Sequence, residues 1–259
     1  MVKLTNYPLK VGYSCLISSV VNAINYCNQD IDDGIFFLLG EGFNLFDYSS
    51  ENFRSISDIH FNQLSYRVVE TFFNIIGIRC KREKYCNSID ECKERIKKDI
   101  KLEYPLVFNV SSASLIYSDL WVSGDREHYF TVIGIDDDGV IIADIYLADV
   151  FGQNISVYKG GLDFLRFQEA CMRFDWGYLS IDYETLKRTK LSFSKEYLLN
   201  ELEKNLCFYL HGNTSYYQKL IQFADDICQF PNKFSNVNLM SVMILAKLML
   251  KLISLCFQI

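Results

Sequence analysis

The chain has 259 residues, 50% of them apolar and 15% aromatic, so it is long enough for one large domain or for one domain with an appendage. A net charge of −6 and scattered lysines argue against a protein that binds the phosphate backbone of nucleic acids. With only 13 glycines and 3 prolines, the composition also argues against a disordered or fibrous chain.

The cysteines and the N-terminus indicate the compartment. The nine cysteines are odd in number, and none of them form a Cys-x-x-Cys pair. We therefore expect neither a disulfide framework nor a zinc site, and mostly reduced, buried thiols. The first ten residues, MVKLTNYPLK, contain no long apolar run of the kind found in secretory signals. Together these features predict a cytoplasmic protein without a metal site.

Apolar periodicity predicts four helices in the first part of the chain, at 15–27, 31–40, 61–77 and 88–103. The first of them begins with Cys15, which therefore lies in the first turn of a helix. The second ends at Gly40, and a glycine loop and an aromatic run follow it. The fourth begins with a capping box from Ser88 to Glu91.

Strands are predicted in the middle of the chain, at 104–110, in a hairpin at 128–146 and in a short segment within 151–161. A further helix at 162–177 ends in a glycine. Because helices come first and strands follow, the order favours an α+β fold over an alternating parallel sheet.

The sequence changes in character after about residue 183, where three helical segments follow one another. The last of them is the most hydrophobic part of the chain, but Lys247 and Lys251 lie within it, four residues apart on one face. This favours a core or partner-facing helix over a membrane span. We therefore predict a catalytic domain at 1–183 and a helical C-terminal extension at 184–259.

Three residues have the chemistry of a cysteine enzyme. A thiolate is stabilised by a helix N-terminus and by a nearby imidazolium, and Cys15 has the first of these. Its backbone N–H, which lacks an intrahelical partner, can also hold a developing oxyanion. The hairpin DREHYFTVIGIDDDGVIIADIY places His128 and Asp144 on facing strands, near the end away from the DDDG turn. There they can serve as the base and as the group that orients it.

The nominal register of this hairpin leaves His128 and Asp144 a few residues away from direct opposition. A bulge or a wider turn is needed to bring them together. Each residue also has a simpler interpretation: Cys15 as a small buried hydrophobe, His128 as a strand-edge histidine and Asp144 as a strand end. Only the order and spacing of all three favour catalysis.

Four segments together resemble the family of butirosin biosynthesis protein H, N-terminal region: GYSCLISSVVNAINY, FFLLGEGFNLFDY, LVFNV…LIY and EHYFTVIGIDDD. The resemblance covers roughly residues 10–180. The step of sixteen residues from His128 to Asp144 is also similar to that of papain-like cysteine enzymes, including the bacteriocin-leader peptidases.

The resemblance implies a papain-like cysteine protease fold, in which an N-terminal helical part bearing Cys15 packs against an antiparallel sheet. It also implies an acyltransferase of antibiotic and other natural-product biosynthesis, which moves an acyl group from the phosphopantetheine thioester of an acyl or peptidyl carrier protein to a small amine. Cys15 would be the nucleophile, His128 the general base and then acid, and Asp144 the orienting group. No cofactor is implied beyond the phosphopantetheine arm. The resemblance does not decide whether the protein forms a homodimer.

The sequence departs from the papain-like pattern at one position. Those peptidases place a glutamine six residues before the cysteine to complete the oxyanion hole, and here Leu9 stands there. Asn6, Lys10 or a backbone amide could take its place. The absence of this glutamine argues against a peptidase more strongly than against an acyltransferase, because a thioester is already activated and needs less help from the oxyanion hole. A cysteine peptidase or amidohydrolase remains the alternative, and a non-catalytic helical partner-binding protein is the third class.

Four residues are candidates for contact with substrate. Gly40 and Gly42 belong to the LGEGF loop, and Tyr117 and Trp121 belong to the polar and aromatic loop before the hairpin. The two aromatic residues could flank an acyl tunnel, although an ordinary aromatic core explains them equally well. The glycine loop is not a phosphate-binding loop, since no Lys-Ser/Thr follows it.

Overall fold

The computed structural model describes residues 1–12, 14–42, 66–118, 126–148 and 155–210. The helices are α1 (Cys15–Tyr26), α2 (Asp33–Leu39), α3 (Tyr66–Ile75), α4 (Ile89–Lys101), α5 (Phe164–Met172), α6 (Tyr183–Arg188) and α7 (Lys195–Leu210). The strands are β1 (Val2–Lys3), β2 (Cys80–Lys84), β3 (Leu106–Ser111), β4 (Glu127–Ile135), β5 (Gly139–Ala148), β6 (Ile155–Asp163) and β7 (Gly177–Ile181). Trp121, the aromatic run after Gly42 and the last two predicted helices lie outside these residues.

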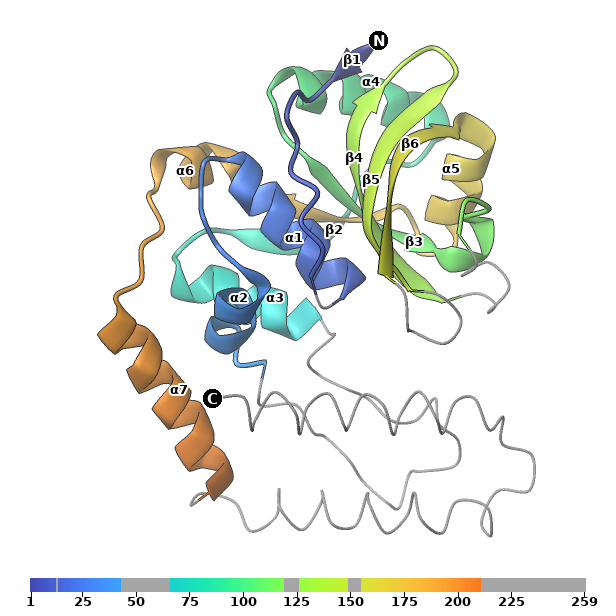
Figure 1. The fold of residues 1–259 in the computed structure, drawn as a ribbon. Helices are drawn as coiled ribbons and strands as arrows, with labels where there is room; N and C mark the ends of the chain where they lie inside the picture. Colours follow the sequence, from blue (N-terminus) through green and yellow to red (C-terminus); the bar gives the residue numbers. More distant parts are fainter. Residues whose placement is uncertain (13, 43–65, 119–125, 149–154, 211–259) are drawn as a thin grey trace, which may run out of the picture.

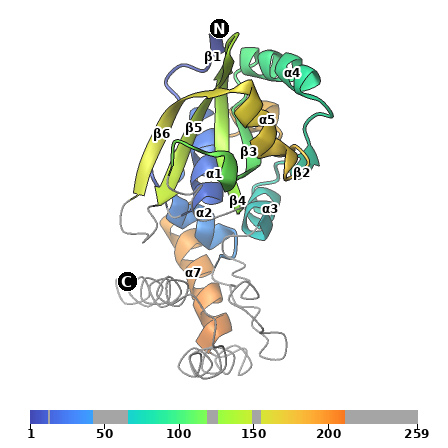
Figure 2. The ribbon, with the colours of Figure 1, turned by 90° about the vertical axis from the view of Figure 1, so that its right-hand side faces the viewer.

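The strands form one antiparallel sheet in the order β2-β7-β3-β4-β5-β6, and β1 pairs with β4 at the end of that strand. Helices α1, α2 and α3 lie on one side of the sheet, and α4 and α5 lie on the other (Figures 1 and 2). The predicted α+β class is confirmed. The helices before the hairpin, the hairpin itself and the helix after it stand where the sequence predicts them.

Three strands were not predicted: the two-residue β1, and β2 and β7. In β2 only Cys80 is buried, and the other four residues, KREK, are exposed and charged. Such a strand has no alternating pattern, and its charges protect an open sheet edge from pairing with another chain. The sequence of β7, GYLSI, directly follows α5 and was too short to separate from it.

The sheet separates two hydrophobic clusters, because successive side chains of a strand point to opposite faces. Leu106, Phe108 and Val110 of β3 join the cluster that contains α4 and α5, whereas Val107 joins the cluster that contains α1, α2 and α3. The positions at the centre of α1 are 0% exposed, among them Val20 and Val21 in that second cluster. The helix that carries Cys15 is therefore fixed firmly against the sheet.

The polar side chains buried on α1 all have partners. Ser18 donates to Asp33 Oδ2 at 3.2 Å. The Asn22 side chain donates to the carbonyl of Lys10 at 2.8 Å and accepts a hydrogen bond from the backbone N–H of Lys10 at 2.9 Å. These bonds hold the chain before α1 and the start of α2 against the helix, and they account for polar residues on an otherwise apolar face.

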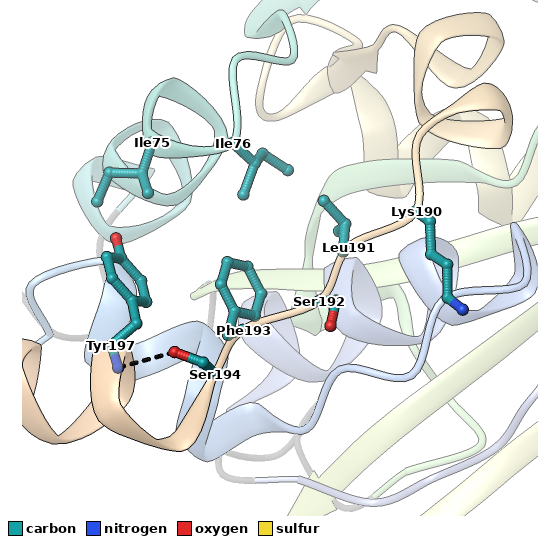
Figure 3. A pocket seen from close by; sticks show the side chains of 8 residues that line it. All are labelled: Ile75, Ile76, Lys190, Leu191, Ser192, Phe193, Ser194 and Tyr197. Carbon is teal, nitrogen blue, oxygen red and sulfur yellow. Dashed lines mark hydrogen bonds between the residues drawn. The ribbon is translucent and has the colours of Figure 1, made fainter.

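The segment after α6 stays attached to the first domain. Gln29 donates to the carbonyls of Leu186 and Thr189 and accepts from the N–H of Leu191 at 2.9 Å. Leu191, Phe193 and Tyr197 then line a groove of about 460 Å³ against the end of α3, and Ser194 accepts a hydrogen bond from the N–H of Tyr197 (Figure 3). The domain division at residue 183 stays a prediction. In the part of the chain described above, no helix is both long and apolar enough to span a membrane.

Candidate active site

The structure brings Cys15, His128 and Asp144 together at one end of the sheet. Cys15 is the first residue of α1, and α1 lies beside β4 and β5 (Figure 1). Cys15 lies near enough to His128, the second residue of β4, to contribute to raising the pKa of its ring. His128 Nε2 lies 2.8 Å from Asp144 Oδ2, which leaves its Nδ1 for the thiol. The ring of His128 thus joins the carboxylate of Asp144 to the neighbourhood of the sulfur.

A bulge in β4 makes this contact possible. Thr131 pairs with Ala143, but the register shifts by one across Ile133, which has no partner in β5. Continued along the strands, this register puts Asp144 two residues away from the position opposite His128. The two side chains then share a face of the sheet, because that face repeats every second residue. Without the bulge the offset would be three residues, and the side chains would point to opposite faces. Of the two possibilities that the sequence raised, a bulge or a wider turn, the structure shows a bulge.

The site is buried and charged. His128 is 4% exposed and Asp144 is 0% exposed. Burial by itself lowers the pKa of His128, but the charges and hydrogen bonds of Asp144 and Cys15 outweigh it and raise the pKa well above 6.5. The raised pKa favours the imidazolium form of the ring, which lies against the Asp144 carboxylate. An imidazolium beside a sulfur stabilises the thiolate, which is the nucleophilic form.

Tyr117 has a contact that the sequence analysis did not predict, because its hydroxyl donates to Asp144 Oδ2 at 2.9 Å. Its contact with substrate stays a prediction. Its ring stacks on Tyr158 with centroids 4.0 Å apart and an interplanar angle of 10°. Burial, followed by the charge of Asp144, raises the pKa of Tyr117 well above 10, so the hydroxyl remains a donor. The LIY segment contained this tyrosine, but no sequence spacing indicates which carboxylate it bonds.

Removing the hydroxyl of Tyr117 tests this role. Tyr117→Phe is expected to lower turnover about 3- to 30-fold, since a hydrogen bond to a charged group is worth about 1.5–3 kcal/mol and part of it is recovered. The substitution should also shift the pH dependence of turnover, because Asp144 loses a hydrogen-bond donor. The control is Tyr7→Phe, which removes another buried hydroxyl bond, the one to Thr131, away from the triad. Equal effects of both variants on the pH profile would contradict a positioning role for Tyr117.

The remaining candidates for the oxyanion hole are the side chain of Lys10 and the backbone amides at the start of α1. Asn6 lines a cavity together with Tyr26 and Cys27, at the end of α1 away from Cys15, so it is excluded. The backbone of Lys10 is engaged by Asn22, as described above. The N–H of Ser18 makes the first internal hydrogen bond of α1, to the carbonyl of Ser14, so the N–H groups of Cys15 and Leu16 have no partner within the helix.

The cap of α1 supports this turn. Ser14 is the N-cap residue, and its hydroxyl accepts a hydrogen bond from the N–H of Ile17 at 3.1 Å. Ser88 caps α4 in the same way, accepting from the N–H of Glu91 at 3.2 Å. The chain thus offers two equivalent caps, of which only one stands next to Cys15.

Both caps can be removed to separate stability from activity. Ser14→Ala and Ser88→Ala are each expected to lower the free energy of unfolding by about 1 kcal/mol, measured by urea denaturation. Only Ser14→Ala should also lower turnover severalfold, because the frayed turn carries the nucleophile and its amides. Equal loss of turnover in both variants would contradict the role of this turn.

The glycines of the LGEGF loop serve packing. A Cβ on Gly40 would come within 2.5 Å of Val68 Cγ1 and 2.6 Å of the Val68 carbonyl, so Gly40 lets α2 approach α3 closely. A Cβ on Gly42 would come within 2.4 Å of the ring of Phe37. Contact with substrate stays a prediction for both, and Trp121 lies outside the described residues.

The structure describes the side chains of six cysteines, and all six of these are free. Five are buried, and Cys15 alone among these six is partly exposed. Over the same described residues, no group of three or more His, Cys, Asp or Glu side chains is arranged to hold a metal ion.

Comparison with known proteins gives the family. The family model described as "Butirosin biosynthesis protein H, N-terminal" matches residues 14–145, just over half of the chain. The chain belongs to this family. The matched butirosin protein H region begins at the cap of α1 and ends just after Asp144, so it contains Cys15, His128 and Tyr117 as well.

A crystal structure described as that of a C39-like peptidase from Bacillus anthracis is also similar. It shares 16% sequence identity with this chain, the match covers 75% of this chain and 98% of that one, and the TM-score is 0.44. No curated protein matches. In this structure a helix that begins with Cys15 packs on an antiparallel sheet that bears His128 and Asp144, as the sequence analysis expected.

Proposed function

We propose that this protein is a cysteine-dependent acyltransferase of natural-product biosynthesis. It moves an acyl group from the phosphopantetheine thioester of an acyl or peptidyl carrier protein, through an acyl-Cys15 intermediate, to a small amine. The observation that carries the proposal is the placement of Cys15, at the start of α1, beside the hydrogen-bonded pair of His128 and Asp144 in a member of the butirosin protein H family. Such an arrangement supplies a nucleophile, a proton carrier and its orienting group.

In the first half-reaction the Cys15 thiolate attacks the thioester carbonyl carbon, and the negative charge moves to the carbonyl oxygen. The N–H groups at the start of α1 stabilise that oxyanion. The carbon–sulfur bond to the donor then breaks, and the leaving thiolate takes a proton from the His128 imidazolium. The products are a thioester on Cys15, a free phosphopantetheine thiol and a neutral imidazole.

In the second half-reaction a neutral amine attacks the acyl-Cys15 carbonyl. His128 takes the proton that the amine nitrogen loses, and the carbon–sulfur bond to Cys15 breaks. The amide leaves, and the thiolate–imidazolium pair is restored. Asp144 stays ionised throughout and holds the ring in place, as its 2.8 Å contact with Nε2 allows.

The alternative is a cysteine peptidase or amidohydrolase that uses the same triad with water as the acceptor. Leu9 in place of the glutamine favours an activated substrate, because such a substrate needs less help at the oxyanion. The depth of the site favours transfer as well: a ring that is 4% exposed leaves little access for bulk water.

A product analysis separates these functions. The protein is incubated with an acyl carrier thioester, with and without an amine, and amide and free acid are quantified by mass spectrometry. Transfer predicts that amide forms in excess of free acid and that an acyl adduct on Cys15 accumulates when the amine is left out. Free acid at the same rate with and without amine would establish the hydrolase, and the absence of any adduct or product would favour the non-catalytic, partner-binding class.

A further inference from the structure

We infer that Asp33 is a positioning residue of the active site, whose buried carboxylate fixes the chain before Cys15 against the first turns of α1. Asp33 is the first residue of α2. The proposed function uses the triad and the amides at the start of α1, and it assigns no role to α2. The inference goes beyond that function, because it concerns the nucleophile and holds whether the acceptor is an amine or water.

Helix capping does not account for Asp33. The N-cap of α2 is Asp32, whose side chain is exposed and accepts a hydrogen bond from the N–H of Ile35 at 2.7 Å. Asp33 follows it in the sequence but is only 5% exposed. Burying a carboxylate is costly unless it gains hydrogen bonds or a charge partner. Two adjacent aspartates thus have different surroundings, and the second contacts α1.

Three segments meet at the Asp33 carboxylate. Its Oδ2 accepts a hydrogen bond from the hydroxyl of Ser18 in α1 at 3.2 Å. It also lies against the backbone of Gly12, where a Cβ would come within 1.6 Å of Asp33 Oδ2 and 2.6 Å of Ser18 Oγ. The carboxylate therefore fills the space that a side chain at position 12 would need.

These contacts lie on both sides of the nucleophile in the sequence. Gly12 is three residues before Cys15, and Ser18 is three residues after it, nearly one turn along the helix. A carboxylate that contacts both restricts the direction in which the chain enters α1. It thereby restricts the orientation of the Cys15 side chain and of the N–H groups that hold the oxyanion. Such orientation matters, because a misplacement of about 1 Å can lower a rate about 10²-fold.

The rest of α2 fixes the position of Asp33. Phe36 is 0% exposed and packs against Phe72 of α3, with ring centroids 4.2 Å apart. At the end of the helix, Gly40 allows the close approach to α3 described above. The FFLLGEGF segment, which the proposed function does not use, thus anchors the helix that carries Asp33 to the nucleophile.

The pH dependence of Cys15 alkylation by iodoacetamide tests this role without any substrate. We expect Asp33→Ala to slow alkylation at pH 7 at least about 5-fold and to shift its pH profile to higher pH, because a displaced turn no longer stabilises the thiolate. Loss of the negative charge alone would shift the profile to lower pH. Asp32→Ala is the matched control, since it removes the adjacent carboxylate that caps α2. It should leave the rate within about 2-fold and the profile in place.

Gly12→Ala disturbs the same contact without changing a charge. The added methyl group would displace the carboxylate, so alkylation of Cys15 should again slow at least about 5-fold. In the Asp33→Ala protein the methyl group has room, because the hydroxyl of Ser18 can rotate away. There Gly12→Ala should change the rate less than about 2-fold.

The outcomes decide the inference independently of the reaction that the protein catalyses. It is overturned by an unchanged or faster rate in Asp33→Ala, by an equal loss in Asp32→Ala, or by fully additive effects of Asp33→Ala and Gly12→Ala. If Asp33→Ala does not fold, Gly12→Ala decides, because a slowed reaction sustains the inference and an unchanged rate overturns it. No acyl donor or acceptor is present, so the result stands even if the product analysis finds no amide and the proposed function fails.

Discussion

Cys15→Ala is expected to lower turnover of an acyl thioester by a factor of at least about 10³, because removal of the nucleophile of a catalytic triad leaves only binding and oxyanion stabilisation. The acyl adduct should disappear with it. Alanine is small and favourable in helices, so the fold should persist, and a thermal unfolding curve close to that of the parent would show this. The measurement is the steady-state rate with a carrier-bound thioester, combined with intact mass of the protein.

The matched control stands at the other end of the same helix. Cys27 is 2% exposed, and burial raises its pKa to about 11, so it is a protonated thiol at neutral pH. Cys27→Ala should therefore cost some stability and leave turnover within about 2-fold. A Cys15→Ala protein that turns over substrate at the rate of Cys27→Ala would contradict the assignment of the nucleophile.

The second large effect is expected at Asp144. Asp144→Asn keeps the shape of the side chain but removes the charge that holds the His128 imidazolium, and it should lower turnover by about 10²- to 10⁴-fold. The pKa of His128 is raised by Asp144 and Cys15. Removal of Asp144 should therefore lower that pKa, and the alkaline limb of the pH profile for acylation should move to lower pH.

The raised pKa of His128 should also make the stability of the folded protein depend on pH. A histidine whose pKa in the folded protein exceeds its unfolded value stabilises the fold fully below about pH 6.5, and this contribution is lost as pH rises through the raised value. In Asp144→Asn this pH dependence should be smaller. Asp136→Asn is the control, since Asp136 accepts hydrogen bonds from Asp138 and Gly139 in the turn of the same hairpin. An unchanged pH profile in Asp144→Asn would contradict the role of the carboxylate.

Local patterns in the sequence predicted the parts of this site that depend on neighbouring residues. Helix periodicity placed Cys15 in the first turn of α1, and two apolar strands joined by an acidic turn placed His128 and Asp144 on one hairpin. The bulge could be expected only because the nominal register failed to bring the two together. Its position at Ile133 depends on packing across the sheet, which the hairpin sequence does not specify.

Such local patterns could not predict contacts between residues that lie far apart in the sequence. Arg82 meets Glu127 only because β7 pairs between β2 and β3, and the charged sequence of β2 gave no strand pattern. The same holds for Tyr117, whose bond to Asp144 crosses from a loop to β5. The loop glycines Gly40 and Gly42 were attractive as substrate contacts, but their lack of a side chain is needed for packing against Val68 and Phe37.

Alkylation by iodoacetamide tests most directly whether Cys15 is activated by His128, because it requires no knowledge of the substrate. At pH 7, peptide mapping of all nine cysteines should show Cys15 modified at least 10-fold faster than any other. Because Cys15 is partly exposed, its accessibility contributes to that difference as well as its activation. The decisive comparison is His128→Ala, in which Cys15 is no less accessible but has lost its imidazolium. We predict that its alkylation slows at least 10-fold; an unchanged rate at Cys15 would contradict the account.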